Sequence, residues 1–162
     1  MKKAFLLFAV LIAVVSCNNN NEQVQSLQTR VDSLQNQLNQ TYSAGFGEMM
    51  TNIQIHHAKL WFAGKNKNWD LAKYEIDELK ETFDDIQKYQ KARSESEMVP
   101  MIIPAIDSIT TTIENENLSQ FESSFKYLTN TCNDCHLATG HDYNVIVVPQ
   151  TMPFTNQKFT PE

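Results

Sequence analysis

Residues 118–136 read LSQFESSFKYLTNTCNDCH, and their apolar side chains recur at helical spacing. The recurring positions, separated by 3, 4, 3, 4 and 3 residues, are Leu118, Phe121, Phe125, Leu128, Cys132 and Cys135. Such a stripe occupies one face of an α-helix, so the pattern predicts a helix that buries this face and both cysteines. Asn117 is its expected N-cap, and Gln120 completes a capping-box arrangement.

Three further amphipathic helices are predicted before this one. We expect the first over about residues 48–63, the second from the N-cap Asn68 to about Ala92, and the third from the prolines at positions 100 and 104. The stripe of the first helix is Met50, Ile53, His57 and Leu60, with Gly64 as its C-terminal stop. Short links between these helices predict an all-α fold, an antiparallel four-helix bundle over residues 44–141.

The helical pattern ends after Gly140. Val145 to Val148 is extended and β-branched, and three later prolines exclude a helix: Pro149, Pro153 and Pro161. We therefore expect residues 142–162 to form an extended tail wrapped over the bundle.

The N-terminus has the features of an export signal. Lys2 and Lys3 precede an unbroken apolar run, and Ser16 and Cys17 close it, as in a secretory signal peptide of residues 1–17. The ending also resembles the lipobox of bacterial lipoproteins, which implies that Cys17 carries a lipid anchor. The alternative is an ordinary signal peptide with an incidental cysteine. In both cases we expect an exported protein. If it is a lipoprotein, the lipid anchors it to a membrane, on the periplasmic or outer-surface side.

A short heptad pattern follows a polar tether of residues 18–23. Its apolar positions within the segment 24–43 are Val24, Leu27, Val31, Leu34 and Leu38. About two heptads are too few for a stable isolated coiled coil. Two interpretations stay open: a stalk that forms a homo-oligomer through residues 24–42, or an amphipathic helix packed on its own domain.

The chain is acidic, with a formal charge of −6. Without Lys2 and Lys3, 11 basic side chains oppose 19 acidic ones, which gives −8 for the mature chain. This charge argues against nucleic-acid binding and favours a basic protein partner, whose association would weaken as salt rises.

Cys132-Asn133-Asp134-Cys135-His136 matches the signature of c-type haem attachment. Thiols at positions i and i+3 of a helix can form thioethers to the two vinyl groups of one haem, and the next imidazole can bind the iron. The alternatives are a disulfide between the cysteines, or a zinc site that adds His136 and His141 to them. Adjacent Cys135 and His136 would be a cramped zinc chelate, so we predict one covalent haem c.

The chain resembles the class II c-type cytochromes, the cytochrome c-prime group, over residues 47–141. The stretches QIHHAKLWFAG (54–64), NWDLA (68–72) and CHLATGH (135–141), with the tail around 149–159, also resemble a group of exported bacterial monohaem cytochromes. The class II resemblance implies that His136 is the proximal iron ligand. It also implies a distal methionine from the first helix in low-spin members and an open distal side in high-spin members.

The candidates for the sixth iron position are Met49, Met50, His56, His57, His141 and Met152. If the end of the first helix is level with the start of the last, Met50 lies about 7 Å and His57 about 18 Å from the level of His136. Met50 is therefore preferred, with Met49 and His57 as alternatives. Met50 can equally be a core filler, and His57 a hydrogen-bonded core imidazole. His141 is expected to cap the helix or contact a propionate, and Met152 sits in a Thr-Met-Pro sequence like the ligand loop of class I cytochromes.

These features predict an electron carrier that is not an enzyme, since no nucleophile–base pair or paired carboxylates stand out. The first alternative is a haem protein that binds NO, CO or O2 at an open distal site. The second is a structural zinc lipoprotein.

Overall fold

The computed structural model describes residues 21–38 and 44–162, which belong to two separate compact units divided after Ser43. The predicted signal peptide, the lipidation site Cys17, and the parts of the tether and stalk at 18–20 and 39–43 lie outside the described residues. Among the described residues, no helix combines the length and apolar character needed to cross a membrane.

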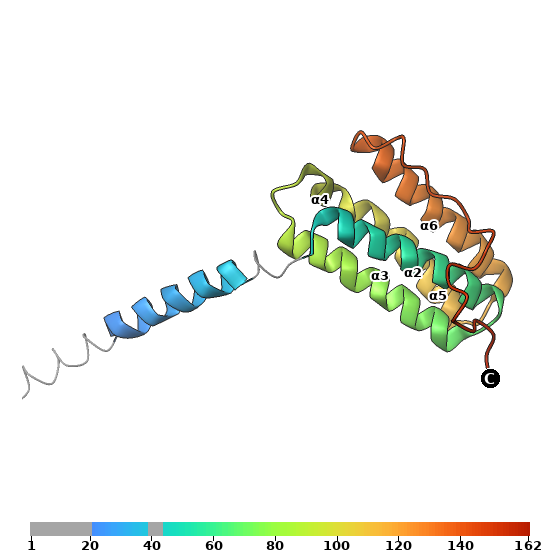
Figure 1. Ribbon diagram of the computed structural model, residues 1–162, viewed down its shortest axis with the longest axis horizontal. Coiled ribbons are helices and arrows are strands. Elements are labelled where there is room, and N and C mark those ends of the chain that lie inside the picture. Colours follow the sequence, from blue (N-terminus) through green and yellow to red (C-terminus); the bar gives the residue numbers. More distant parts are fainter. Residues whose placement is uncertain (1–20, 39–43) are drawn as a thin grey trace, which may run out of the picture. The chain divides into compact units, whose positions relative to one another are not determined.

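In the first unit, residues 21–38 form one helix, as the heptad pattern predicts (blue in Figure 1). Its apolar seam faces solvent, with exposed fractions between 49% and 64% for Val24, Leu27, Val31, Leu34 and Leu38.

The second unit is helical, which confirms the all-α class: no strand occurs among the described residues. Its elements are α2 (Phe46–Lys65), α3 (Trp69–Tyr89), α4 (Ser94–Met98), the 3-10 turn η1 (Val99–Ile102), α5 (Ile103–Glu114) and α6 (Leu118–Ala138). Pro100 and Pro104 each stand in the first turn of an element, where the missing N–H breaks no helical hydrogen bond. The predicted third helix is therefore divided into η1 and α5, and the short helix α4 before it was not predicted.

Both predicted N-caps are confirmed. The side chain of Asn68 accepts a hydrogen bond from the Leu71 N–H at 3.2 Å, and that of Asn117 accepts one from the Gln120 N–H at 3.1 Å. The prediction for Gly64 was wrong, because α2 continues past it to Lys65. Gly64 instead allows a close approach between helices, since a Cβ there would overlap the ring of Phe121.

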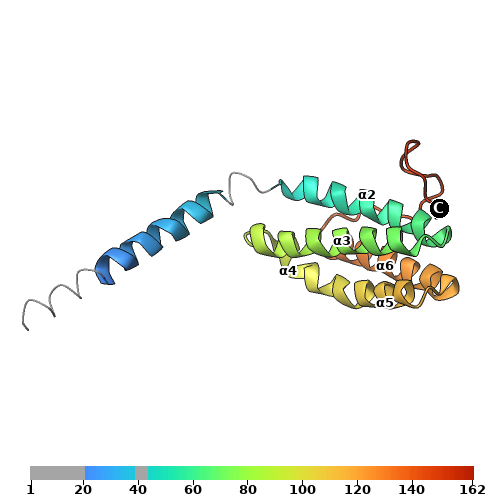
Figure 2. The same cartoon turned by 90° about the horizontal axis from the view of Figure 1, so that it is seen from below.

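The helices pack side by side through a shared apolar core. The main contacts join α2 to α3, α5 to α6, α3 to α5 and α2 to α6, and α3 lies between α2 and α5 (Figure 2). Met49, 4% exposed, occupies the core position that the sequence pattern assigned to Met50, which is only half-buried. The periodic pattern predicts which face of α2 is buried, but it does not show which of the adjacent Met49 and Met50, at the edge of that face, points into the core.

The contacts between α2 and α6 fix how the two helices are aligned. His57 pairs with Thr129, Trp61 with Phe125, and Gly64 with Phe121, so residue numbers rise along one helix as they fall along the other. Counting seven residues back from His57 and seven on from Thr129 brings Met50 level with His136. The sequence argument placed Met50 about 7 Å from this level, so the observed alignment differs by about five residues.

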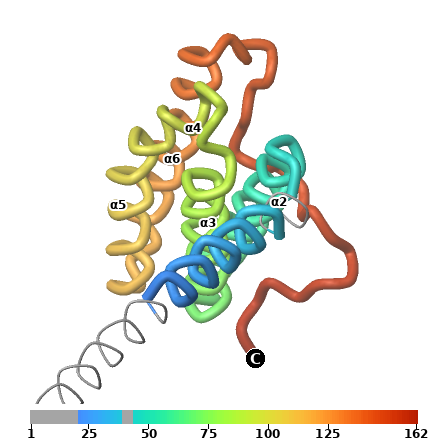
Figure 3. Tube along the Cα trace, turned by 90° about the vertical axis from the view of Figure 1, so that its left-hand side faces the viewer, coloured from blue at the N-terminus to red at the C-terminus, as the bar shows by residue number. Residues whose placement is uncertain are grey.

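The C-terminal segment contains no helix or strand from His141 onward, in agreement with the predicted tail. It leaves the end of α6 and passes along the outer side of α2 (Figure 3). Phe159 is buried against Phe62 with ring centroids 5.8 Å apart, and Lys59 lies over the ring of Phe154. These contacts hold the tail on the helices.

Candidate functional site

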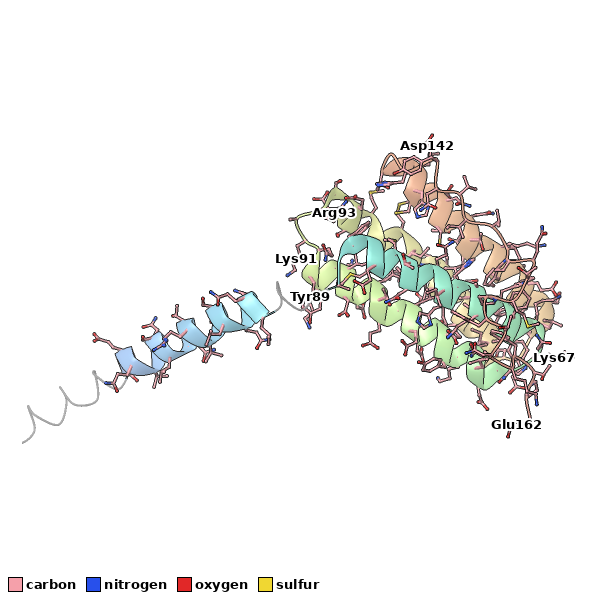
Figure 4. All side chains as sticks on the ribbon, in the orientation of Figure 1. Lys67, Tyr89, Lys91, Arg93, Asp142 and Glu162 are labelled. Carbon is pink, nitrogen blue, oxygen red and sulfur yellow. The ribbon has the colours of Figure 1, made fainter. Side chains whose placement is uncertain are left out.

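An apolar cavity opens at the end of the second unit where α2 begins and α6 ends. Arg93 and Asp142, just outside α4 and α6, lie at this end, opposite Lys67 (Figure 4). The lining side chains come from α2, α3, α4, η1, α6 and the tail: Phe46, Met50, Phe83, Glu95, Met98, Val99, Ile102, Cys132, Cys135, His136, Thr139, His141 and Asn144. The three residues predicted to bind the haem, Cys132, Cys135 and His136, therefore line one cavity.

A second hollow adjoins the first. The two share Met50, Cys132, His136 and Asn144, and the second is further lined by residues that include Gln54, His57 and Ile146. The side chains of Cys132, His136 and Met50 thus border free space on more than one side.

The two cysteines differ in burial. Cys132 packs against the apolar core, and burial raises the pKa of its thiol to about 12. Cys135 is half-buried; burial and the nearby charge of Glu95 raise its pKa as well. The two sulfur atoms are not joined in a disulfide. Both side chains are therefore protonated thiols at neutral pH, which disfavours thiolate chemistry in the folded chain.

The ring of His136 is oriented by the backbone of the tail. Its Nδ1 atom lies 2.6 Å from the carbonyl oxygen of Asn144. A carbonyl oxygen only accepts hydrogen bonds, so Nδ1 donates to it and Nε2 is the ring nitrogen left for another partner. No sequence pattern predicts this contact, because it joins α6 to an irregular segment.

Asn133, between the two cysteines, also binds the tail. Its Nδ2 donates to the carbonyl oxygen of Ile146 at 2.8 Å, and the Ile146 N–H donates to Asn133 Oδ1 at 2.8 Å. This pair was missed by sequence reasoning, which treated the two residues between the cysteines as spacers.

Four methionines differ in whether they line the two hollows. Met50 lines both hollows, whereas Met49 is buried in the core and Met152 is 58% exposed; neither of these lines the two hollows. Met98 lines the larger cavity from the end of α4 and was not among the sequence candidates. It was overlooked because α4 is a five-residue helix without a usable periodic pattern.

The three histidine candidates other than His136 have protein partners. His57 is 3% exposed; its Nε2 lies 2.9 Å from Thr129 Oγ1 and its ring 4.4 Å from that of Phe125, centroid to centroid. Burial lowers the pKa of His57 to about 4.

His56 lies outside both hollows, with its Nδ1 2.6 Å from the Oε2 atom of the buried Glu75. His141 lines the larger cavity beside Thr139, whose Oγ1 is 3.2 Å from His141 Nδ1.

In the described part of the chain, no three His, Cys, Asp or Glu side chains are grouped closely enough to share a metal ion. Cys132, Cys135, His136 and His141 therefore do not form such a group. No protein-family model, curated protein or solved structure matches this chain.

Proposed function

We propose that this chain is a monohaem c-type cytochrome that carries electrons at the extracytoplasmic face of a bacterial membrane. The observation that supports this most is that Cys132, Cys135 and His136 line one apolar cavity, with Met50 level with His136 on α2. We further propose that α2, α3, α5 and α6 form an antiparallel four-helix bundle of the class II type.

The residues present fit a covalent haem. The two thiols stand at i and i+3 of α6, the spacing that two thioether bonds to one porphyrin edge require. The walls of the cavity are mostly apolar, which suits a porphyrin. His136 exposes Nε2 as a nitrogen ligand, because Nδ1 is engaged by Asn144.

Haem c held here would supply a one-electron ferric–ferrous couple. The protein residues would set its reduction potential. A methionine ligand from Met50 and burial by Phe46, Phe83 and Ile102 would favour the ferrous state. The carboxylate of Glu95 in the cavity wall would favour the ferric state, because a negative charge stabilises the more positive iron.

The charge of the mature chain, −8, supports a basic redox partner and no nucleic-acid ligand. A lipid on Cys17 would hold the protein at the membrane. The exposed seam of residues 24–38 supports self-association, and Val24 and Val31 at a positions with Leu27 and Leu34 at d positions favour a parallel dimer.

The test is the alkaline pyridine spectrum of the mature protein, isolated from a host that matures c-type cytochromes. The expected result is a haem c spectrum in the wild type and its loss in the double variant Cys132→Ala/Cys135→Ala. Asp134→Ala, which changes an exposed residue inside the motif, serves as control and should retain the haem. Zinc in place of haem would contradict the proposal.

The second hollow beside Met50 favours one alternative, a haem protein that binds NO, CO or O2 on the Met50 side. Carbon monoxide added to the reduced protein separates the two functions. Slow or incomplete binding indicates a bound methionine and an electron carrier, whereas rapid and complete binding indicates an open gas site.

A further inference from the structure

The tail is tied to the haem motif at two points that lie two residues apart. Asn133 makes a reciprocal pair of 2.8 Å hydrogen bonds with the backbone of Ile146, and the Asn144 carbonyl oxygen receives the Nδ1 proton of His136 at 2.6 Å. An amide side chain that pairs with both the N–H and the C=O of one residue fixes that residue in position and orientation.

The Asn144 carbonyl is constrained from the other side as well. The His141 N–H donates to the His136 carbonyl oxygen at 2.7 Å, and the Asn144 N–H donates to the His141 carbonyl oxygen at 2.8 Å. This turn brings the chain back from the end of α6, and the Asn133–Ile146 pair holds it there. Asn144 thus sits between two fixed points, and its carbonyl oxygen is aimed at the imidazole.

We infer that Asn133 is a positioning residue for the iron ligand His136, acting through Ile146 and the Asn144 carbonyl. This inference rests on the proposed haem function. The hydrogen bond from Nδ1 leaves Nε2 as the ligand atom and increases the electron density of the ring, which strengthens its bond to ferric more than to ferrous iron. Loss of the clamp therefore shifts the redox equilibrium toward the ferrous form.

A purely structural role for Asn133 predicts something different. The tail has independent anchors in the Phe159–Phe62 contact and the Lys59–Phe154 contact, so it can remain docked without Asn133. A residue that only anchors the tail would change its stability and leave the redox equilibrium of the haem unchanged.

The experiment measures the midpoint potential of haem-loaded, full-length mature protein with Asn133→Ala. We expect the ferrous-to-ferric ratio at a fixed potential to rise by up to tenfold, which is about 59 mV for one electron. The matched control is Asn130→Ala, an exposed asparagine one turn earlier on α6, which should leave the potential unchanged. Ile146→Pro provides an independent variant: it removes the N–H that donates to Asn133 and leaves the haem motif intact.

A potential unchanged in both Asn133→Ala and Ile146→Pro would overturn the inference while leaving the haem proposal intact. If the wild-type chain holds no haem, the proposed function fails first, and the clamp is then tested by ¹⁵N NMR of the His136 ring in that chain. The Nδ1–H tautomer in the wild type, shifting toward Nε2–H in Asn133→Ala, supports the clamp. The same tautomer in both proteins contradicts it.

Discussion

The Nε2 atom of His57 lies 2.9 Å from the hydroxyl oxygen of Thr129, 72 residues away in the chain. Thr129 Oγ1 in turn donates to the Phe125 carbonyl oxygen at 2.9 Å, so His57 Nε2 must be the donor. This contact ties α2 to α6 and defines the alignment that brings Met50 level with His136. Burial of the imidazole in the core lowers its pKa and keeps it neutral.

The buried His57 predicts loss of stability in mild acid. In the unfolded chain the imidazole binds a proton below pH about 6.5, whereas in the folded chain its pKa is about 4. Unfolding therefore takes up a proton between these values, and the free energy of unfolding falls by about 3 kcal/mol as pH drops from 6.5 to 4. Chemical denaturation across this range should show a shallower fall in His57→Gln. Parallel pH profiles for the two proteins would contradict the assignment.

Gly64 is predicted to be intolerant of a methyl group. Alanine favours a helix over glycine by up to about 1 kcal/mol, but its Cβ would overlap the fully buried ring of Phe121. Gly64→Ala should destabilise the protein by about 1–3 kcal/mol, measured by denaturant unfolding. Gly47→Ala, in the same helix and facing open space, should cost nothing or stabilise. Stabilisation by both substitutions would rule out the close approach of α2 and α6.

Met50 is predicted to be the sixth iron ligand in preference to Met98. Met50→Ala should convert the ferric haem from low spin to high spin and accelerate carbon monoxide binding to the ferrous form, because the sixth position is freed. Met98→Ala removes a methionine from the same cavity and should change neither the spin state of the ferric haem nor the rate of carbon monoxide binding. A low-spin Met50→Ala protein together with a high-spin Met98→Ala protein would reverse the assignment.

The seam of residues 24–38 is predicted to join two copies of the chain. Leu27→Lys/Leu34→Lys places charges at two d positions and should abolish concentration-dependent dimerisation, measured by sedimentation equilibrium. Ser26→Lys/Ser33→Lys adds the same charges off the seam and should retain the dimer. A monomeric wild type at all concentrations, or equal association of both variants, would exclude the seam as an interface.

Local patterns predicted the parts of the fold that depend on neighbouring residues. The helix α6 and the caps at Asn68 and Asn117 are set within a few positions, and the structure confirms them. The predicted stripe of α6 is buried at Phe121, Phe125 and Leu128, whereas Leu118, Cys132 and Cys135 are only partly buried. Other features depend on distant partners. The role of Gly64 is set by Phe121, and the order of Met49 and Met50 is set by how α2 is rotated against its neighbours.

The residues of the candidate site also divide into those that a local pattern predicts and those that depend on distant partners. Cys132, Cys135 and His136 could be found from their spacing, because attachment chemistry requires it. The roles of Asn144 and Asn133 could not be predicted, because their hydrogen bonds join α6 to a tail that has no periodic pattern. Met98 was hidden because prolines divide its region into short elements.

The most direct test of the haem proposal is the intact mass of the mature wild-type chain, measured under denaturing conditions after expression with a c-type maturation system. The account predicts a chain heavier by one haem, with the addition mapped to the peptide that contains Cys132 and Cys135. A chain of unmodified mass, with both thiols free or joined in a disulfide, would contradict it.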